Sequence, residues 1–264
     1  EDYKRVLQSL PEQLRDILLK GDFSAQFDKN HPWQVVPGEW VDKAFQRWES
    51  RPRPEGLAMS AIGADPARGG QANGVLAPRY GNWYDRLVVV PGRDIPDGPA
   101  FAALCVAHRG QQACVNLDVV GIGAAVYDAL KDAVPVAAMN GAGSAEGLTD
   151  RSGRLGFVNL RSYWIWSFME ALDPDRGADI ALPPSPRLKE DLCEPRWRLR
   201  GGKIAVESKY DRSGSGEPAI VERLGRSPDE GDAVILAWAG GAAAPLAAAH
   251  FEHSPDMILT SNAD

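Results

Sequence analysis

LAMSAIGAD, residues 57–65, is a short apolar run that ends in an aspartate, and QACVNLD, residues 112–118, repeats this pattern further along the chain. Between them, Gly74–Tyr80 and Trp83–Val90 are two more runs with strand-like composition. The dipeptide Gly81-Asn82 joins this pair, and such a dipeptide is a strong signal for a hairpin turn. These four runs predict a sheet whose first three strands form an antiparallel meander.

The segments that follow alternate between helical and strand-like patterns. Gly98–His108 has helical spacing, and Gly121–Ala133 places Ile122, Val126 and Leu130 on one helical face before the apolar run Val134–Met139. Three strands in a meander, followed by helix, strand, helix and strand, are the order of the ribonuclease H-like fold. We therefore predict the α/β class, with a mixed sheet flanked by helices.

The outer parts of the chain have a different character. Two helices are expected before residue 50, followed by the break at 51–54, Arg-Pro-Arg-Pro. After the sheet, Asn159–Leu172 is a long apolar helix, Arg196–Arg200 and Lys203–Ser208 form a second hairpin, and Pro228–Ala239 is a closing helix. We expect an N-terminal helical linker (1–54), a main domain (55–240) and a C-terminal tail (241–264), in a chain that starts partway through a longer protein.

Composition narrows the classes of function. The 264 residues carry a net charge of −7 and only three cysteines, and they contain neither a long apolar run nor a phosphate-binding loop motif. These features disfavour a membrane protein, a disulfide framework, a zinc module and a P-loop enzyme. Residues 151–226 nevertheless carry a local charge of +3. That segment is either a DNA-facing surface or an ordinary solvated face.

Three aspartates stand where the apolar elements end or begin. Asp65 follows the first strand, Asp118 follows the fourth, and Asp232 lies early in the closing helix. In the predicted sheet the first and fourth strands are neighbours, so the first two carboxylates should meet and the helix can supply the third. Several carboxylate oxygens suit Mg²⁺ or Mn²⁺, and two such ions could hydrolyse a phosphodiester. The alternative is that Asp118 only forms an Asx turn or a helix cap.

At these motifs the sequence resembles the nuclease domain of the large terminase subunit of tailed bacteriophages. The resemblance covers residues 57–238 and keeps the order of the motifs. The matching stretches are IGADPARGG (62–70), VNLDVVGIG (115–123), FVNLR (157–161), IALPP (180–184), ESK (207–209) and RLGRSPDEGDA (223–233).

The resemblance implies an endonuclease that cuts concatemeric double-stranded viral DNA during genome packaging, in the host bacterial cytoplasm. It implies that Asp65, Asp118 and Asp232 hold two Mg²⁺ or Mn²⁺ ions, with Asp229 either helping or capping the helix. It also implies a packaging ATPase domain in the same protein, and a portal and a small terminase subunit as partners. The basic residues expected to contact DNA are Lys209, Arg196, Arg198, Arg200 and Lys203.

Two departures from the family pattern bear on activity. Relatives commonly carry acidic residues after the Gly-Gly of the first motif, whereas residues 71–73 of this chain read Gln-Ala-Asn. The ATPase domain is also absent from this sequence. A non-catalytic module that docks the packaging motor and tracks DNA is therefore an alternative, as is a junction-resolving nuclease of the same fold.

Overall fold

The computed structural model describes residues 33–210 and 218–247, without the side chains of 241–247. A six-stranded mixed sheet forms the centre of the described chain. Five of its strands follow the order β3-β2-β1-β5-β6, and the sixth, β4, pairs with the part of β2 that β3 does not contact. The bounds of the strands are β1 Ala61–Asp65, β2 Asn73–Tyr80, β3 Trp83–Tyr84, β4 Val88–Pro91, β5 Cys114–Asp118 and β6 Val136–Met139. The first strands are antiparallel, whereas β1, β5 and β6 run parallel.

The third predicted strand is broken in two. We expected one run over Trp83–Val90, but β3 and β4 pair separately with β2. The break lies opposite Pro78, which has no N–H to donate to a neighbouring strand. At this point the three residues 85–87 lie opposite only two residues of β2, 77 and 78. The carbonyl of Pro78 accepts a hydrogen bond from Asp85 N at 2.9 Å. The two pieces keep the predicted antiparallel direction.

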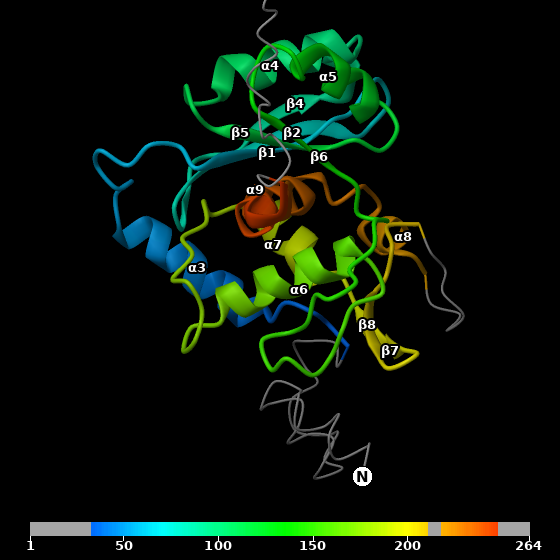
Figure 1. Cartoon of the computed structure of the whole chain (residues 1–264). Helices are drawn as coiled ribbons and strands as arrows, with labels where there is room; N and C mark the ends of the chain where they lie inside the picture. The colour runs from blue at the N-terminus through cyan, green and yellow to red at the C-terminus, as the bar shows by residue number, and fades with distance from the viewer. Residues whose placement is uncertain (1–32, 211–217, 248–264) are drawn as a thin grey trace, which may run out of the picture.

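Helices cover both faces of the sheet (Figure 1). On one face lie α4 (Gly98–His108) and α5 (Gly123–Leu130), which pack on a core that includes Ile62, Val115 and Leu117. Against the other face lies α9 (Asp229–Ala247), and α6 (Leu160–Leu172), α7 (Pro186–Cys193) and α3 (Gly38–Ser50) lie beyond it. Every residue from Ala233 to Ala237 on α9 is buried, as expected for a helix enclosed by its neighbours.

Side chains of the sheet fasten α9 to it. Arg79 on β2 donates to the carbonyl of Ala237 at 2.8 Å, and Asn116 on β5 donates to that of Leu236 at 3.0 Å. Gly63 on β1 allows the close approach, because a Cβ atom built there would lie 1.9 Å from the carbonyl oxygen of Ala233. The position of α9 over β1 and β5 is thus fixed by contacts far apart in the sequence.

The smaller elements lie around this body. The second predicted hairpin is present as β7 (Trp197–Arg200) and β8 (Lys203–Val206), while α7 and the short α8 (Ile220–Leu224) were not predicted. The second predicted N-terminal helix is α3, and its Trp40, Val41 and Ala44 belong to the core formed with α6 and α7. The first predicted helix lies outside the described residues. The division into linker, domain and tail stays a prediction, although α9 continues past residue 240.

Candidate acidic site

Two adjacent parallel strands bring the first two aspartates together. Asp65 ends β1 and Asp118 ends β5, and the register pairs Ala64 with Leu117, one residue before each aspartate. Neighbouring strands lie about 4.8 Å apart, so the backbones that carry these two carboxylates are adjacent. This agrees with the prediction that the first and fourth strands are neighbours.

The third aspartate comes from α9. Asp232 lies in the first turn of this helix, and the ammonium group of Lys209 pairs with it at 2.6 Å and with Asp65 at 3.6 Å. The Asp232 oxygen in this pair is Oδ2, which is buried. One lysine therefore links a strand-end carboxylate to a helix carboxylate. We call Asp65, Asp118 and Asp232 the acidic site.

Burial governs the electrostatics of the acidic site. Asp65 is 6% exposed, and burial raises its pKa well above the ordinary value; Lys209 opposes this rise, whereas the neighbouring aspartates add to it. Burial likewise raises the pKa of Asp118. Burial alone would lower the pKa of Lys209, but Asp232 and Asp65 outweigh this and raise it. The carboxylates repel one another in a poorly solvated place, and a cation stabilises them there.

Asp118 and Asp229 also make the local contacts expected of turn and cap residues. Asp118 Oδ1 accepts a hydrogen bond from Val120 N at 3.0 Å, which is an Asx turn, and this leaves its second oxygen for other partners. Asp229 begins α9, and its Oδ2 accepts from Asn73 N at 2.8 Å. Asp229 thereby holds Asn73, the last residue of the segment 71–73, and it contributes to the raised pKa of Asp65.

The predicted basic residues fall into two groups. Lys209 lies inside the acidic site with its side chain 21% exposed, whereas we expected it to face DNA. Arg198, Arg200 and Lys203 are exposed on the β7–β8 hairpin, and Arg196 is partly buried at its base. Arg196 N donates to Glu207 Oε1 at 2.9 Å, and Glu207 precedes Lys209 by two residues. The hairpin and the lysine of the acidic site are therefore joined through one short segment.

Sequence reasoning missed three groups that support the acidic site. Asp191 on α7 is fully buried and accepts hydrogen bonds from Glu230 N and Gly231 N, so it caps the helix that carries Asp232. Burial raises its pKa to about 7, although its ion pair with Arg226 opposes the rise. Arg223 forms salt bridges with Glu194 and with Glu207, and these fix the segment that leads to Lys209. Nothing in the sequence pattern marked Asp191, since it lies in an ordinary charged helix.

The third missed group is Arg161, at the end of a stretch already noted in the sequence. Its guanidinium donates through Nη1 to the carbonyl of Glu207 and lies within the electrostatic reach of Asp232 and Asp118. Burial lowers the pKa of this arginine, although arginine stays charged in proteins. The acidic site thus has two cations close to its carboxylates, Lys209 between Asp65 and Asp232 and Arg161 beside them.

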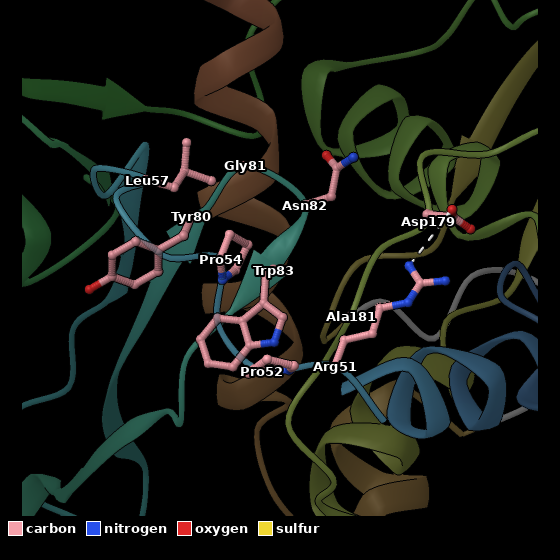
Figure 2. Close-up of a pocket in the computed structure, with 10 residues that line it drawn as sticks. All are labelled: Arg51, Pro52, Pro54, Leu57, Tyr80, Gly81, Asn82, Trp83, Asp179 and Ala181. Carbon is pink, nitrogen blue, oxygen red and sulfur yellow. Dashed lines mark ion pairs between the residues drawn. The ribbon is translucent and has the colours of Figure 1, made fainter. Parts of the chain in front are cut away.

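A separate pocket of about 420 Å³ lies elsewhere on the molecule (Figure 2). Tyr80 and Trp83 line it together with the segment after α3, and an ion pair of 3.8 Å between Arg51 and Asp179 lies at its side. Ala61 pairs with Arg79, next to Tyr80, so this pocket lies near the start of β1, whereas Asp65 ends that strand. The pocket contains none of the predicted site residues.

The sheet order, the parallel β1–β5 pair and the helix across it define a ribonuclease H-like fold. Solved structures of the nuclease domain of the large terminase subunit gp2 of bacterial virus Sf6 share this fold. A mutant of that domain with calcium is 17% identical, with a TM-score of 0.58 and coverage of 77% of this chain and 97% of that one. The unmodified domain is 16% identical, with a TM-score of 0.57 and the same coverage.

A third similar structure is a mutant of the Sf6 domain with manganese and beta-thujaplicinol. It is 15% identical, has a TM-score of 0.56, and covers 77% of this chain and 97% of its own. No protein-family model matches the chain, and no curated protein sequence matches it. Within the described residues, no helix is both long and apolar enough to cross a membrane.

Proposed function

We propose that this chain is a divalent-metal-dependent DNA endonuclease that cuts concatemeric double-stranded viral DNA during genome packaging. The observation that carries the proposal is the meeting of Asp65 and Asp232 around one cation, beside Asp118 at the ends of two parallel strands. The fold likeness to terminase nuclease domains, two of them solved with calcium or manganese, supports it.

Asp65, Asp118 and Asp232 fit a hard divalent cation. They offer only carboxylate oxygens, which are the ligands that such cations prefer, and the buried Oδ2 of Asp232 already pairs with the ammonium group of Lys209. Within the described residues no group of three or more His, Cys, Asp or Glu side chains is arranged to hold a metal ion, and Lys209 occupies the space between Asp65 and Asp232. We propose that these aspartates, with Asp229 beside them, would hold two Mg²⁺ or Mn²⁺ ions.

Such ions would supply an activated water and stabilise the leaving 3′ oxygen of a phosphodiester. The chain itself orients the carboxylates: Asp191 caps α9 and so sets Asp232, and the Asx turn sets Asp118. When the carboxylates are engaged by divalent ions, Lys209 loses its partners and its ammonium group becomes available to a DNA phosphate. This role agrees with the predicted DNA contact of Lys209.

A second candidate function rests on Lys209 as well. A lysine that already neutralises the carboxylates favours slow cleavage by the isolated chain, so the domain could act mainly by docking the packaging motor and tracking DNA. In either case the proposed partners are double-stranded DNA, an ATPase domain of the same protein, the portal and the small terminase subunit. The proposed location is the cytoplasm of the host bacterium.

Plasmid cleavage tests the endonuclease proposal. Supercoiled plasmid is incubated with the chain in Mg²⁺, in Mn²⁺ and in EDTA, and nicked and linear products are measured over time. We expect slow, non-specific nicking with Mn²⁺ or Mg²⁺ and none in EDTA. Absence of cleavage in every condition, together with an absence of heat on titration with Mn²⁺, would leave only the docking function.

The Lys209→Ala substitution should strengthen Mn²⁺ binding. It removes the cation that pairs with Asp65 and Asp232, so the metal no longer competes with an ion pair, and we expect an affinity about 10-fold higher, equivalent to ~1.4 kcal/mol. Without metal the variant should melt at a lower temperature than the unmodified chain, because the buried carboxylates lose their partner. Titration calorimetry and thermal melting in EDTA measure the two effects. Lys131→Ala, which breaks only the exposed pair with Asp128, is the control.

The β7–β8 hairpin should carry most of the DNA affinity. Replacing its three exposed basic residues, Arg198, Arg200 and Lys203, by alanine removes up to three phosphate contacts. The slope of log K against log salt should then fall in magnitude by about 3. Fluorescence anisotropy with a short duplex in EDTA measures this slope. A matched variant without three exposed basic residues elsewhere, Arg93, Lys131 and Arg176, should keep the original slope; equal losses in both variants would exclude the hairpin as the interface.

A further inference from the structure

Arg161 has a hydrogen-bonding group that the protein leaves unsatisfied. Its Nη1 atom donates to the carbonyl of Glu207, but its Nη2 atom is buried and has no partner among the described residues. A buried donor without an acceptor loses its hydrogen bonds to water and gains none in exchange, which destabilises the folded protein. Such a donor is retained at little net cost where a ligand supplies the acceptor.

The backbone around Arg161 is held firmly in place. Arg161 is the second residue of α6, and Arg161 N donates to the carbonyl of Gly141 at 2.9 Å. Asn159 caps the helix by accepting from Ser162 N, and Ser162 Oγ in turn accepts from Val206 N on β8 at 3.0 Å. The first turn of α6 is thus joined to the hairpin that leads to Lys209. The guanidinium is therefore presented from a rigid base.

The surroundings of the guanidinium indicate the chemistry of the missing acceptor. The carboxylates that act on it are Asp232, Glu207 and Asp118, two of which belong to the acidic site. Glu207 is already engaged by Arg223 and by Arg196 N. The guanidinium fork suits the oxygens of a phosphate, which it can bind with two parallel hydrogen bonds.

We propose that Nη2 of Arg161 donates a hydrogen bond to a non-bridging oxygen of the DNA phosphodiester at the acidic site. This assignment rests on the proposed nuclease function and deepens it. Lys209 and the hairpin supply general attraction to the backbone of DNA, whereas Arg161 fixes one phosphate beside Asp118 and Asp232. Arg161 would then be a catalytic residue that contacts the substrate directly.

Metal-promoted DNA binding tests the assignment without relying on cleavage. Anisotropy of a short duplex is measured in EDTA and in Ca²⁺, which is itself a hard, oxygen-binding cation. We expect the unmodified chain to bind more tightly in Ca²⁺. Arg161→Gln should lose about 10-fold of that gain. In Mn²⁺ its single-turnover cleavage rate should fall about 100-fold.

Two further variants separate phosphate binding from a general charge effect. Arg161→Lys keeps the charge but not the fork, so we expect it to restore less than a tenth of the lost rate. Arg176→Gln, at an exposed arginine just beyond the other end of α6, should behave like the unmodified chain. Mn²⁺ titration and thermal melting of Arg161→Gln show whether the acidic site and the fold are intact.

The possible outcomes are distinct. If the unmodified chain shows neither Ca²⁺-promoted binding nor cleavage, the nuclease function fails and the assignment fails with it. If the unmodified chain shows both and Arg161→Gln equals it, only the assignment of Arg161 is overturned. Full recovery by Arg161→Lys also overturns it, since charge alone would then suffice. Loss in Arg161→Gln with little recovery by lysine supports it.

Discussion

Asp65→Asn and Asp232→Asn are each expected to reduce metal-dependent DNA cleavage by at least about 1000-fold, which corresponds to ~4 kcal/mol of activation free energy. Asparagine has nearly the same shape as aspartate, so the packing of β1 and α9 should persist. It removes the negative charge on which binding of a hard cation depends. The same variants should lose measurable Mn²⁺ binding, because each of them removes one of the two carboxylates that surround Lys209.

The matched control is Asp128→Asn, which neutralises an exposed aspartate on α5 that pairs with Lys131. Cleavage and Mn²⁺ binding should equal those of the unmodified chain. A variant at Asp65 or Asp232 that keeps more than about a tenth of the activity would remove that residue from the proposed metal ligands. Equal activity in all the proteins, the two site variants included, would indicate a contaminating nuclease.

The order of the sheet could be predicted from short-range patterns. Three strands in a meander, followed by helix, strand, helix and strand, match the element order of the ribonuclease H-like fold, and that fold places β1 beside β5. Because the register of a parallel pair places equivalent ends together, the meeting of these two aspartates followed from the order. The break between β3 and β4 could not be predicted from the order of the elements, because it depends on how Pro78 of β2 faces residues 85–87.

The environment of the carboxylates could not be predicted, because it depends on long-range contacts. Lys209 belongs to a polar segment after β8, and only the tertiary structure shows that its ammonium group lies between Asp65 and Asp232. Asp191 caps a helix that begins 38 residues later, at Asp229. Arg161 had been noted only as part of a matching stretch. Burial and pairing, rather than residue type, give these side chains their roles.

Gly63→Ala is expected to lower the free energy of unfolding by at least about 3 kcal/mol, or to prevent folding altogether. The added Cβ atom would lie 1.9 Å from the carbonyl oxygen of Ala233 and 2.5 Å from Ala237 N. Both are backbone atoms of α9, so no side-chain rotation relieves the overlap. In a protein of this size the loss should appear as a melting temperature about 6–12 °C lower.

Gly156→Ala is the matched control, since a Cβ atom there would have its nearest neighbour at 3.7 Å. It should leave the melting temperature within about 2 °C of the original value, because a change of 0.5 kcal/mol or less is usual at such positions. If Gly63→Ala unfolds at the same denaturant concentration as this control, α9 does not rest on β1 as closely as the structure has it.

The consequence of Gly63→Ala for the acidic site follows from where the glycine lies. Gly63 precedes Asp65 by two residues on β1, and Ala233 follows Asp232 directly on α9. Any shift of α9 that accommodates the new methyl group must therefore move Asp232 away from Asp65. A folded Gly63→Ala protein should bind Mn²⁺ at least about 10-fold more weakly, although no carboxylate has been changed. Calorimetry on the folded fraction measures this loss, and undiminished binding would show that α9 does not set the distance between the two carboxylates.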